Sequence, residues 1–228
     1  MTLLLASLAP VLAVALFIYW RDEHEKEPIR LLWRAYLFGA LGVIPTLILS
    51  VMMMPLGLDE GSDNLAMSFV SVGLGVAVVE ELSKFLGVRW FIYRNHEFNE
   101  PYDGIAYCAM AALGFASVEN IMYVFDGGME VAVARAFTAV PGHAIDGVFI
   151  GYFLGMQKFK KKKGLEYVGL AAAVVFHTLY DFWLFQAENY PVFILFFLIT
   201  FVIAFRLALK AIKHHRTSSP FRFKSNNS

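Results

Sequence analysis

The chain has 228 residues, of which 58% are hydrophobic and 16% aromatic, and its formal net charge at pH 7 is zero. A soluble domain of this length carries a much larger share of polar residues. A balanced charge also gives no support for nucleic-acid binding. The composition therefore excludes an ordinary soluble domain and indicates a protein whose partner is the lipid bilayer.

Seven apolar blocks follow one another along the chain. A helix that crosses a bilayer needs roughly 20 apolar residues, and each block comes close to or exceeds that length. They are Met1–Trp20, Leu31–Met54, Leu65–Val79 continued by Phe85–Tyr93, Gly104–Phe125, Val131–Met156, Leu165–Phe185 and Pro191–Leu209. We predict an all-α fold, a polytopic membrane helix bundle of about seven transmembrane helices. An eighth crossing or a re-entrant piece is the alternative at residues 132–142, which Pro141 interrupts.

The blocks leave room for one domain only. Residues 1–213 are expected to form a single integral-membrane domain, and residues 214–228 a short disordered cytoplasmic tail, because the tail is basic and rich in Ser and Asn. The first block contains an A-x-A pattern at Ala13 and Ala15. It lacks a basic segment before the apolar run, so we expect a transmembrane helix rather than a cleaved signal peptide.

Basic residues alternate along the chain. The segments after the first, third, fifth and seventh blocks hold 17 of the 19 Lys and Arg residues. The segments after the other blocks hold only Arg135, and Lys84 lies inside a block. Cytoplasmic segments of membrane proteins are enriched in Lys and Arg. The pattern predicts an N-terminus outside the cell and a cytoplasmic C-terminus.

Ionisable and amide side chains interrupt four of the blocks. Such groups are costly against lipid and are expected to face the bundle interior or a wet cavity. Their depth follows from the helical rise of 1.5 Å per residue. Most of these groups fall in the outer half of the membrane, where they could meet in one pocket. They are Glu80, Glu81 and Lys84 in the third block, Asp103 directly before the fourth block with Glu119 and Asn120 inside it, His143 and Asp146 in the fifth, and His177 and Asp181 in the sixth.

Structural roles compete with functional ones at these positions. A single membrane histidine can serve as a helix–helix hydrogen bond, and Lys84 can simply neutralise Glu80 one turn away. Asp103 and Asn120 fit a capping or packing role better than a catalytic one. The recurrence of acids and imidazoles on four helices favours a functional site, because structural polar contacts are made more cheaply by Ser, Thr or Asn.

Three chemical classes fit such a set. A buried glutamate suits general-base activation of water near neutral pH, which would make the protein a hydrolase. Glu119, His143 and His177 could instead be the ligands of a metal-dependent membrane hydrolase. A proton-coupled transporter or channel also uses intramembrane acids and histidines. The sequence contains no G-x-S-x-G and no H-E-x-x-H motif.

The same motifs resemble those of a known family. EELSK, the YDGIAY and GFASVEN segments, PGHAIDG and HTLYD follow the order E-E-x-x-K, F-x-x-x-E, a lone His and H-x-x-x-D. This order is similar to that of the PrsW family of glutamic-type intramembrane proteases, which are related to the CAAX prenyl endopeptidases. The D-x-x-x-x-E-P loop from Asp22 to Pro28 resembles the family as well.

The resemblance implies roles for individual residues. Glu80 would activate water with help from Glu119, although Glu81 remains an alternative base. His177 and Asp181 would stabilise the oxyanion. His143 would complete the catalytic set, with Lys84, Asn120 and Asp103 in support and with no metal or cofactor. Asp146 is an acid where an uncharged residue is expected, so its role stays open.

The resemblance also implies a substrate and a place. Family members cut a single-span membrane protein of the anti-sigma factor type on its extracytoplasmic side, as the first cleavage in envelope-stress signalling. The protein would then be a multi-pass protease of the bacterial plasma membrane.

The charge pattern makes a direct prediction about topology. A reporter fused after Lys163 is expected to be cytoplasmic, and one fused near Asp59 extracytoplasmic. Activities of an alkaline phosphatase and a fluorescent reporter at the two sites measure this. Opposite labelling at both sites would reverse the orientation.

Overall fold

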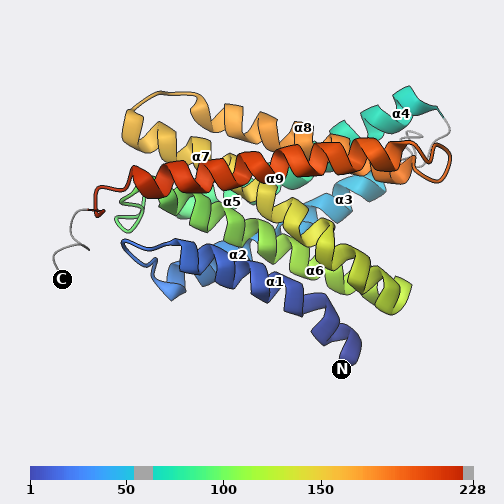
Figure 1. The fold of residues 1–228 in the computed structure, drawn as a ribbon, viewed down its shortest axis with the longest axis horizontal. Coiled ribbons are helices and arrows are strands. Elements are labelled where there is room, and N and C mark those ends of the chain that lie inside the picture. Colours follow the sequence, from blue (N-terminus) through green and yellow to red (C-terminus); the bar gives the residue numbers. More distant parts are fainter. Residues whose placement is uncertain (54–63, 223–228) are drawn as a thin grey trace.

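The computed structural model describes residues 1–53 and 64–222, and these form an elongated bundle of helices (Figure 1). No strand occurs among these residues. The elements are α1 (Thr2–Arg21), α2 (Ile29–Leu41), α3 (Val43–Met53), α4 (Leu65–Val70), the π-helix η2 (Ser71–Ala77), α5 (Val78–Phe91), α6 (Pro101–Phe137), α7 (Ala139–Lys160), α8 (Leu165–Phe185) and α9 (Phe193–Thr217).

The predicted all-α membrane bundle is confirmed. Six segments of the described residues are long and apolar enough to cross a membrane, and one of them, Pro101–Lys160, has 60 residues and holds both α6 and α7. These two helices run antiparallel, because Gly104 near the start of α6 packs against Gly151 in the second half of α7. Counting α6 and α7 separately gives seven crossings.

The chain reverses within α6, at Gly128. Its φ of 74° lies in the left-handed region that favours glycine. Residues 129–137 then form a short helical stretch that ends at Thr138, whose φ is −118°. Pro141 lies in the first turn of α7, where a proline is tolerated. Pro141 therefore does not break the helix, and no eighth crossing begins in the described residues 132–142.

One end of the bundle collects the basic segments. The C-terminal ends of α1, α5, α7 and α9 all lie at this end (Figure 1), which we call the basic end. Residues 214–217 of the expected tail are helical, because α9 continues to Thr217, and Arg216 forms an ion pair with Glu23. Asp59 and residues 223–228 lie outside the described residues.

Glycines set the spacing between α6 and its neighbours. Gly147, Gly151 and Gly155 fall on one face of α7 at intervals of four residues. A Cβ atom added at Gly151 would come within 2.2 Å of the backbone oxygen of Gly104. Small residues let membrane helices approach closely enough for backbone contact. The α6–α7 pair is therefore packed too tightly for any side chain at these positions.

The third crossing is not a uniform α-helix. It runs through α4, η2 and α5, so a π-helical segment ends three residues before Glu80. π-helical turns are rare and are frequently found at functional sites. The sequence analysis treated the crossing as one regular helix, because periodicity does not distinguish a π-turn from an α-turn.

The glycine contact predicts a strong effect of a small substitution. Gly151→Ala is expected to destabilise the protein by about 1–3 kcal/mol, because the added methyl group overlaps the backbone of α6. The midpoint of thermal unfolding in detergent measures this. Gly73→Ala is the matched control, since its Cβ would meet only the Thr178 side chain at 3.3 Å. Equal effects of the two substitutions would contradict the packing argument.

Candidate active site

Three charged residues of α5 form the centre of the site. Glu80, Glu81 and Lys84 have exposed fractions of 5%, 0% and 2%. The Lys84 ammonium lies 3.2 Å from Glu80 Oε2 and 2.7 Å from Glu81 Oε1. Spacings of three and four residues put all three side chains on adjacent parts of one helix face. One buried cation thus contacts both members of the adjacent glutamate pair.

His143 connects this centre to α6. Its Nδ1 atom lies 3.1 Å from Lys84 Nζ, and its Nε2 atom lies 2.7 Å from Glu119 Oε2. An ammonium has only donors, so Nδ1 accepts from Lys84. The Nε2–H group then donates to Glu119. The two contacts therefore select a single neutral tautomer of His143.

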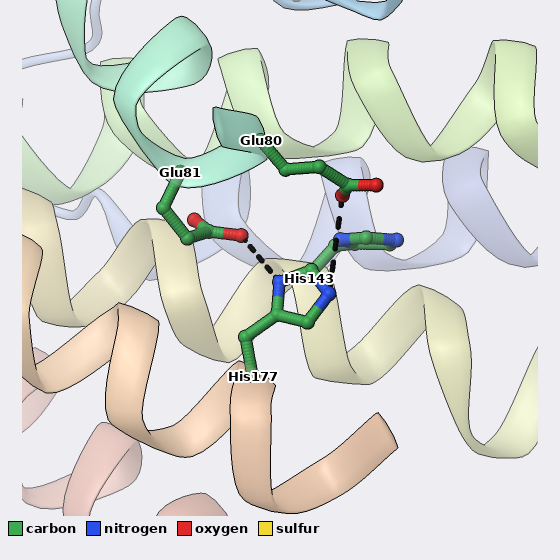
Figure 2. A group of neighbouring side chains, drawn as sticks. All are labelled: Glu80, Glu81, His143 and His177. Carbon is green, nitrogen blue, oxygen red and sulfur yellow. Dashed lines mark hydrogen bonds and ion pairs between the residues drawn. The ribbon is translucent and has the colours of Figure 1, made fainter. Parts of the chain in front are cut away.

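His177 of α8 faces carboxylates on several sides. Its Nδ1 atom lies 2.7 Å from Glu81 Oε1, and its Nε2 atom lies 3.0 Å from Asp181 Oδ2. The same Nε2 atom is 3.9 Å from Glu80 Oε2. Figure 2 shows both glutamates reaching from α5 toward the His177 ring, with His143 beside it. The expected pairing of His177 with Asp181 is present, and Glu81 holds the opposite edge of the ring.

Asp146 also belongs to this cluster. Its Oδ2 atom is 3.6 Å from His177 Nδ1, and its buried Oδ1 atom has no hydrogen-bond partner. The sequence left the role of Asp146 open. The structure places it against His177, on the same helix as His143.

Arg135 is part of the site and was missed by the sequence analysis, which counted it only as a charge outside the membrane. Its Nη2 atom lies 2.6 Å from Glu119 Oε2, and its Nε atom lies 2.6 Å from Asn120 Oδ1. The guanidinium also lies 4.3 Å from the ring centre of Tyr123. The reversal at Gly128 brings Arg135 back to these residues, and no spacing rule in the sequence signals such a contact.

Lys84 was one of three expected supporting residues, and the other two, Asn120 and Asp103, have different positions. Asn120 adjoins the site through Arg135 and also donates to the backbone oxygen of Ser7 at 3.1 Å. Asp103 lies at the basic end, where it accepts hydrogen bonds from the backbone of Asn99 and Glu100. Sixteen residues of helix, about 24 Å, separate Asp103 from Glu119. The structure therefore does not bring Asp103 into the site.

The clustered residues surround a cavity of about 580 Å³. Glu80, but not Glu81, lines it. Apolar side chains of α3, α6 and α8 form much of the remaining wall. A cavity of this size can hold a short peptide segment and water. Its charged wall consists of Glu80, Glu119, Arg135, His143, Asp146, His177 and Asp181, with Asp126 also on the lining.

The site lies away from the basic end. Glu119 is about 27 Å of helix from the start of α6 but only about 13 Å from the reversal at Gly128. Asp181 is about 6 Å from the end of α8. The pocket therefore lies in the half of the bundle opposite the basic end, as the sequence predicted for these helices.

The donor atoms could also hold a metal ion. One donor atom from each of Glu80, Glu81, His143 and His177 lies within 4.8 Å of the others. Two imidazoles and two carboxylates are suitable ligands for zinc. Against this, the Lys84 ammonium already contacts three of these four residues. A divalent cation among the same atoms would lie close to another positive charge.

Known proteins resemble this chain over most of its length. Residues 27–208 match the family described as "PrsW family intramembrane metalloprotease". The protein named Protease PrsW of Geobacillus kaustophilus is 37% identical over 190 residues, which cover 82% of this chain and 81% of that protein. The Protease PrsW of Halalkalibacterium halodurans is 35% identical, over 79% and 82% of the two chains.

A more distant relative covers still more of the chain. The Protease PrsW of Bacillus subtilis is 32% identical over 197 residues, which cover 85% of this chain and 88% of that protein. No solved structure matches the chain. The family match and the relatives agree with the order of motifs seen in the sequence, and the chain belongs to the PrsW family of membrane proteases.

Proposed function

We propose that the protein is an intramembrane endopeptidase in which Glu80 is the general base. One observation carries this assignment: of the two adjacent glutamates, Glu80 lines the cavity, whereas Glu81 is fully buried and accepts from Lys84 and His177. A general base has to reach the water it deprotonates. The relatives are named proteases, which favours a hydrolase over the transporter alternative.

The chemistry requires one proton acceptor that later becomes a donor. Glu80 removes a proton from a water molecule in the cavity as the water oxygen attacks the scissile carbonyl carbon. When the tetrahedral intermediate collapses, the C–N bond breaks. The proton held by Glu80 then passes to the leaving nitrogen, so the carboxylate is regenerated. Lys84 stays 3.2 Å from Glu80 and balances its negative charge between turnovers.

We assign His177 to stabilising the oxyanion. Its Nε2 atom lies 3.9 Å from Glu80 Oε2, so both groups face the same part of the cavity. Glu81 and Asp181 hold the two edges of the ring. Because each ring nitrogen faces a carboxylate, His177 would act as an imidazolium, and its fixed positive charge would stabilise the negative charge that develops in the transition state.

Glu119 has a different role from Glu80. Its Oε2 atom accepts from both Arg135 and His143, each within 2.7 Å. This oxygen is therefore already occupied by two donors, whereas Glu80, among the residues that the structure describes, contacts only Lys84 at hydrogen-bond distance. We assign Glu119 to orienting the water with its other oxygen and to holding the His143 ring, with Arg135 as a positioning residue.

The position of the cavity indicates the side of the membrane on which the substrate would be cleaved. If the basic end is cytoplasmic, as the positive-inside rule implies, the cavity opens in the extracytoplasmic half. The substrate would be a single-span membrane protein of the anti-sigma factor type, cleaved in the bacterial plasma membrane. The protease would then have its N-terminus outside and its C-terminus in the cytoplasm.

A zinc-dependent hydrolase is the second candidate. The four clustered donor atoms and the word "metalloprotease" in the family description favour it. A zinc ion held by Glu80, Glu81, His143 and His177 would act as a Lewis acid on the scissile carbonyl. Lys84 would first have to leave its present contacts. We therefore favour the mechanism without metal.

The first test separates the two glutamates. Glu80→Gln is expected to lower cleavage on the order of 100-fold or more, because the general base is removed. Its loss of thermal stability is expected to be smaller than that of Glu81→Gln, because Lys84 keeps its closer contact with Glu81 and His177 keeps both of its shorter carboxylate contacts. Glu81→Gln is expected to lower both activity and thermal stability, because Lys84 and His177 lose a charged buried partner.

The measurement is cleavage of a single-span reporter in proteoliposomes, with the unfolding midpoint recorded for each variant. Glu188→Gln is the control, because Glu188 is exposed and the substitution makes the same chemical change outside the cavity. Normal cleavage by Glu80→Gln would refute the mechanism.

The second test concerns the metal. Cleavage is expected to be undiminished after prolonged incubation with a strong chelator, because Lys84 supplies the central positive charge. Elemental analysis of the purified protein accompanies the assay. Stoichiometric zinc, together with activity that chelation removes and zinc restores, would favour the metal-dependent candidate instead.

A further inference from the structure

A second group of buried carboxyl groups lies at the basic end, outside the proposed active site. Asp22 and Glu27 follow α1, and Glu100 and Asp103 begin α6. Each of the four residues has an exposed fraction of 2% or less. The loop after α1 lies at the same end of the bundle as the C-terminal end of α9 (Figure 1). The proposed chemistry uses none of these groups.

Some carboxyl oxygens of this group accept hydrogen bonds, and others are buried without a partner. Asp103 Oδ2 accepts from the backbone N–H groups of Asn99 at 2.5 Å and Glu100 at 2.7 Å, and Asp22 Oδ2 accepts from Glu27 N–H at 3.1 Å. Both carboxyl oxygens of Glu27, together with Asp103 Oδ1, are buried without a partner. Ionised carboxylates are acceptors only. A proton on one of them would create the donor that these atoms lack.

The nearby basic side chains form hydrogen bonds or ion pairs with other groups. In the described part of the chain, no Lys or Arg forms an ion pair with any of the four carboxylates. Lys26 donates to backbone oxygens of Tyr19 and Asp22, and Lys158 donates to those of Tyr93 and Asn95. The charged groups that act on Glu27 are Asp22 and Glu25 in its own loop and Asp103 of α6. Lys26 acts on Asp22, Glu100 of α6 lies beside Asp103 and Asp22, and Lys158 of α7 acts on Asp103.

We propose that this cluster binds a proton on Glu27, and that the protonated carboxyl donates a hydrogen bond to Asp103. The bond would join the connection between α1 and α2 to the first turn of α6. It would satisfy one oxygen of each residue and lower the charge of the buried group.

Two further observations fit a buried proton. The cavity next to Asp22 and Glu27 measures about 10 Å³, which has room for roughly one water molecule. Burial and the adjacent negative charge of Asp103 raise the pKa of Glu27 to about 11. Burial also raises the pKa of Asp22 to about 6 and that of Glu100 to about 7.

The raised pKa gives the sign of the effect on stability. The pKa of Glu27 is 4.5 in its ordinary state and about 11 in the folded protein. Between these values the folded protein holds a proton that the unfolded chain releases. The stabilisation is therefore complete below the lower value and decreases as pH rises toward the upper one. Glutamine at position 27 supplies a donor of similar shape that does not titrate.

The test compares thermal unfolding of full-length variants in detergent between about pH 5 and about pH 9. The midpoint of the wild-type protein is expected to fall relative to that of Glu27→Gln as pH rises. Glu188→Gln, an exposed carboxylate changed in the same way, is expected to follow the wild type. Glu27→Met is expected to unfold at a lower temperature at every pH, because Asp103 Oδ1 loses its donor.

Three results would overturn the proposal. One is a Glu27→Gln protein whose midpoint falls with pH in parallel with the wild type. Another is a Glu27→Gln protein that does not fold, since glutamine keeps the donor. The third is stabilisation of the wild type by millimolar Mg²⁺ or Ca²⁺ that Glu27→Gln lacks, which would assign a metal ion to the cluster. The readout is independent of proteolysis, so the fate of the proposed peptidase chemistry does not affect it.

Discussion

The ammonium of Lys84 is the contact on which the rest of the site depends. It touches Glu80, Glu81 and the Nδ1 atom of His143 within 3.2 Å, at an exposed fraction of 2%. Ionised carboxylates in a membrane bundle are costly unless a nearby cation compensates them. Lys84 provides this compensation for two carboxylates at once. Its contact with Nδ1 also fixes the direction in which His143 presents its other nitrogen.

The surrounding helices give the two glutamates different environments. Glu80 and Glu81 are adjacent in the chain and therefore point in directions about 100° apart on the helix. Glu80 points into the cavity, whereas Glu81 points to His177 in the interior of the bundle. The same sequence motif thus supplies one carboxylate that can reach water and one that holds an imidazole.

Close packing of α6 and α7 makes the meeting of the charged residues possible. Gly104 and Gly151 let the two backbones touch, so His143 on α7 comes within hydrogen-bond distance of Glu119 on α6. The reversal at Gly128 then returns Arg135 to the same carboxylate. Glycine positions far from the charged residues therefore control the distances between them.

The sequence by itself determined the all-α membrane bundle and the order of its apolar helices, because long apolar blocks have no stable alternative to helices in a bilayer. It also identified most of the clustered residues, since the cost of burying Glu80, Glu119, His143 or His177 marks each of them without knowledge of their neighbours. Tertiary structure decided the rest. The inclusion of Arg135 and Asp146, the exclusion of Asp103, the π-helical turn and the division of labour between Glu80 and Glu81 depend on contacts between segments far apart in the chain. Local patterns report the preferences of one helix for lipid or water, whereas a contact between two helices depends on how closely their backbones pack and where the chain turns.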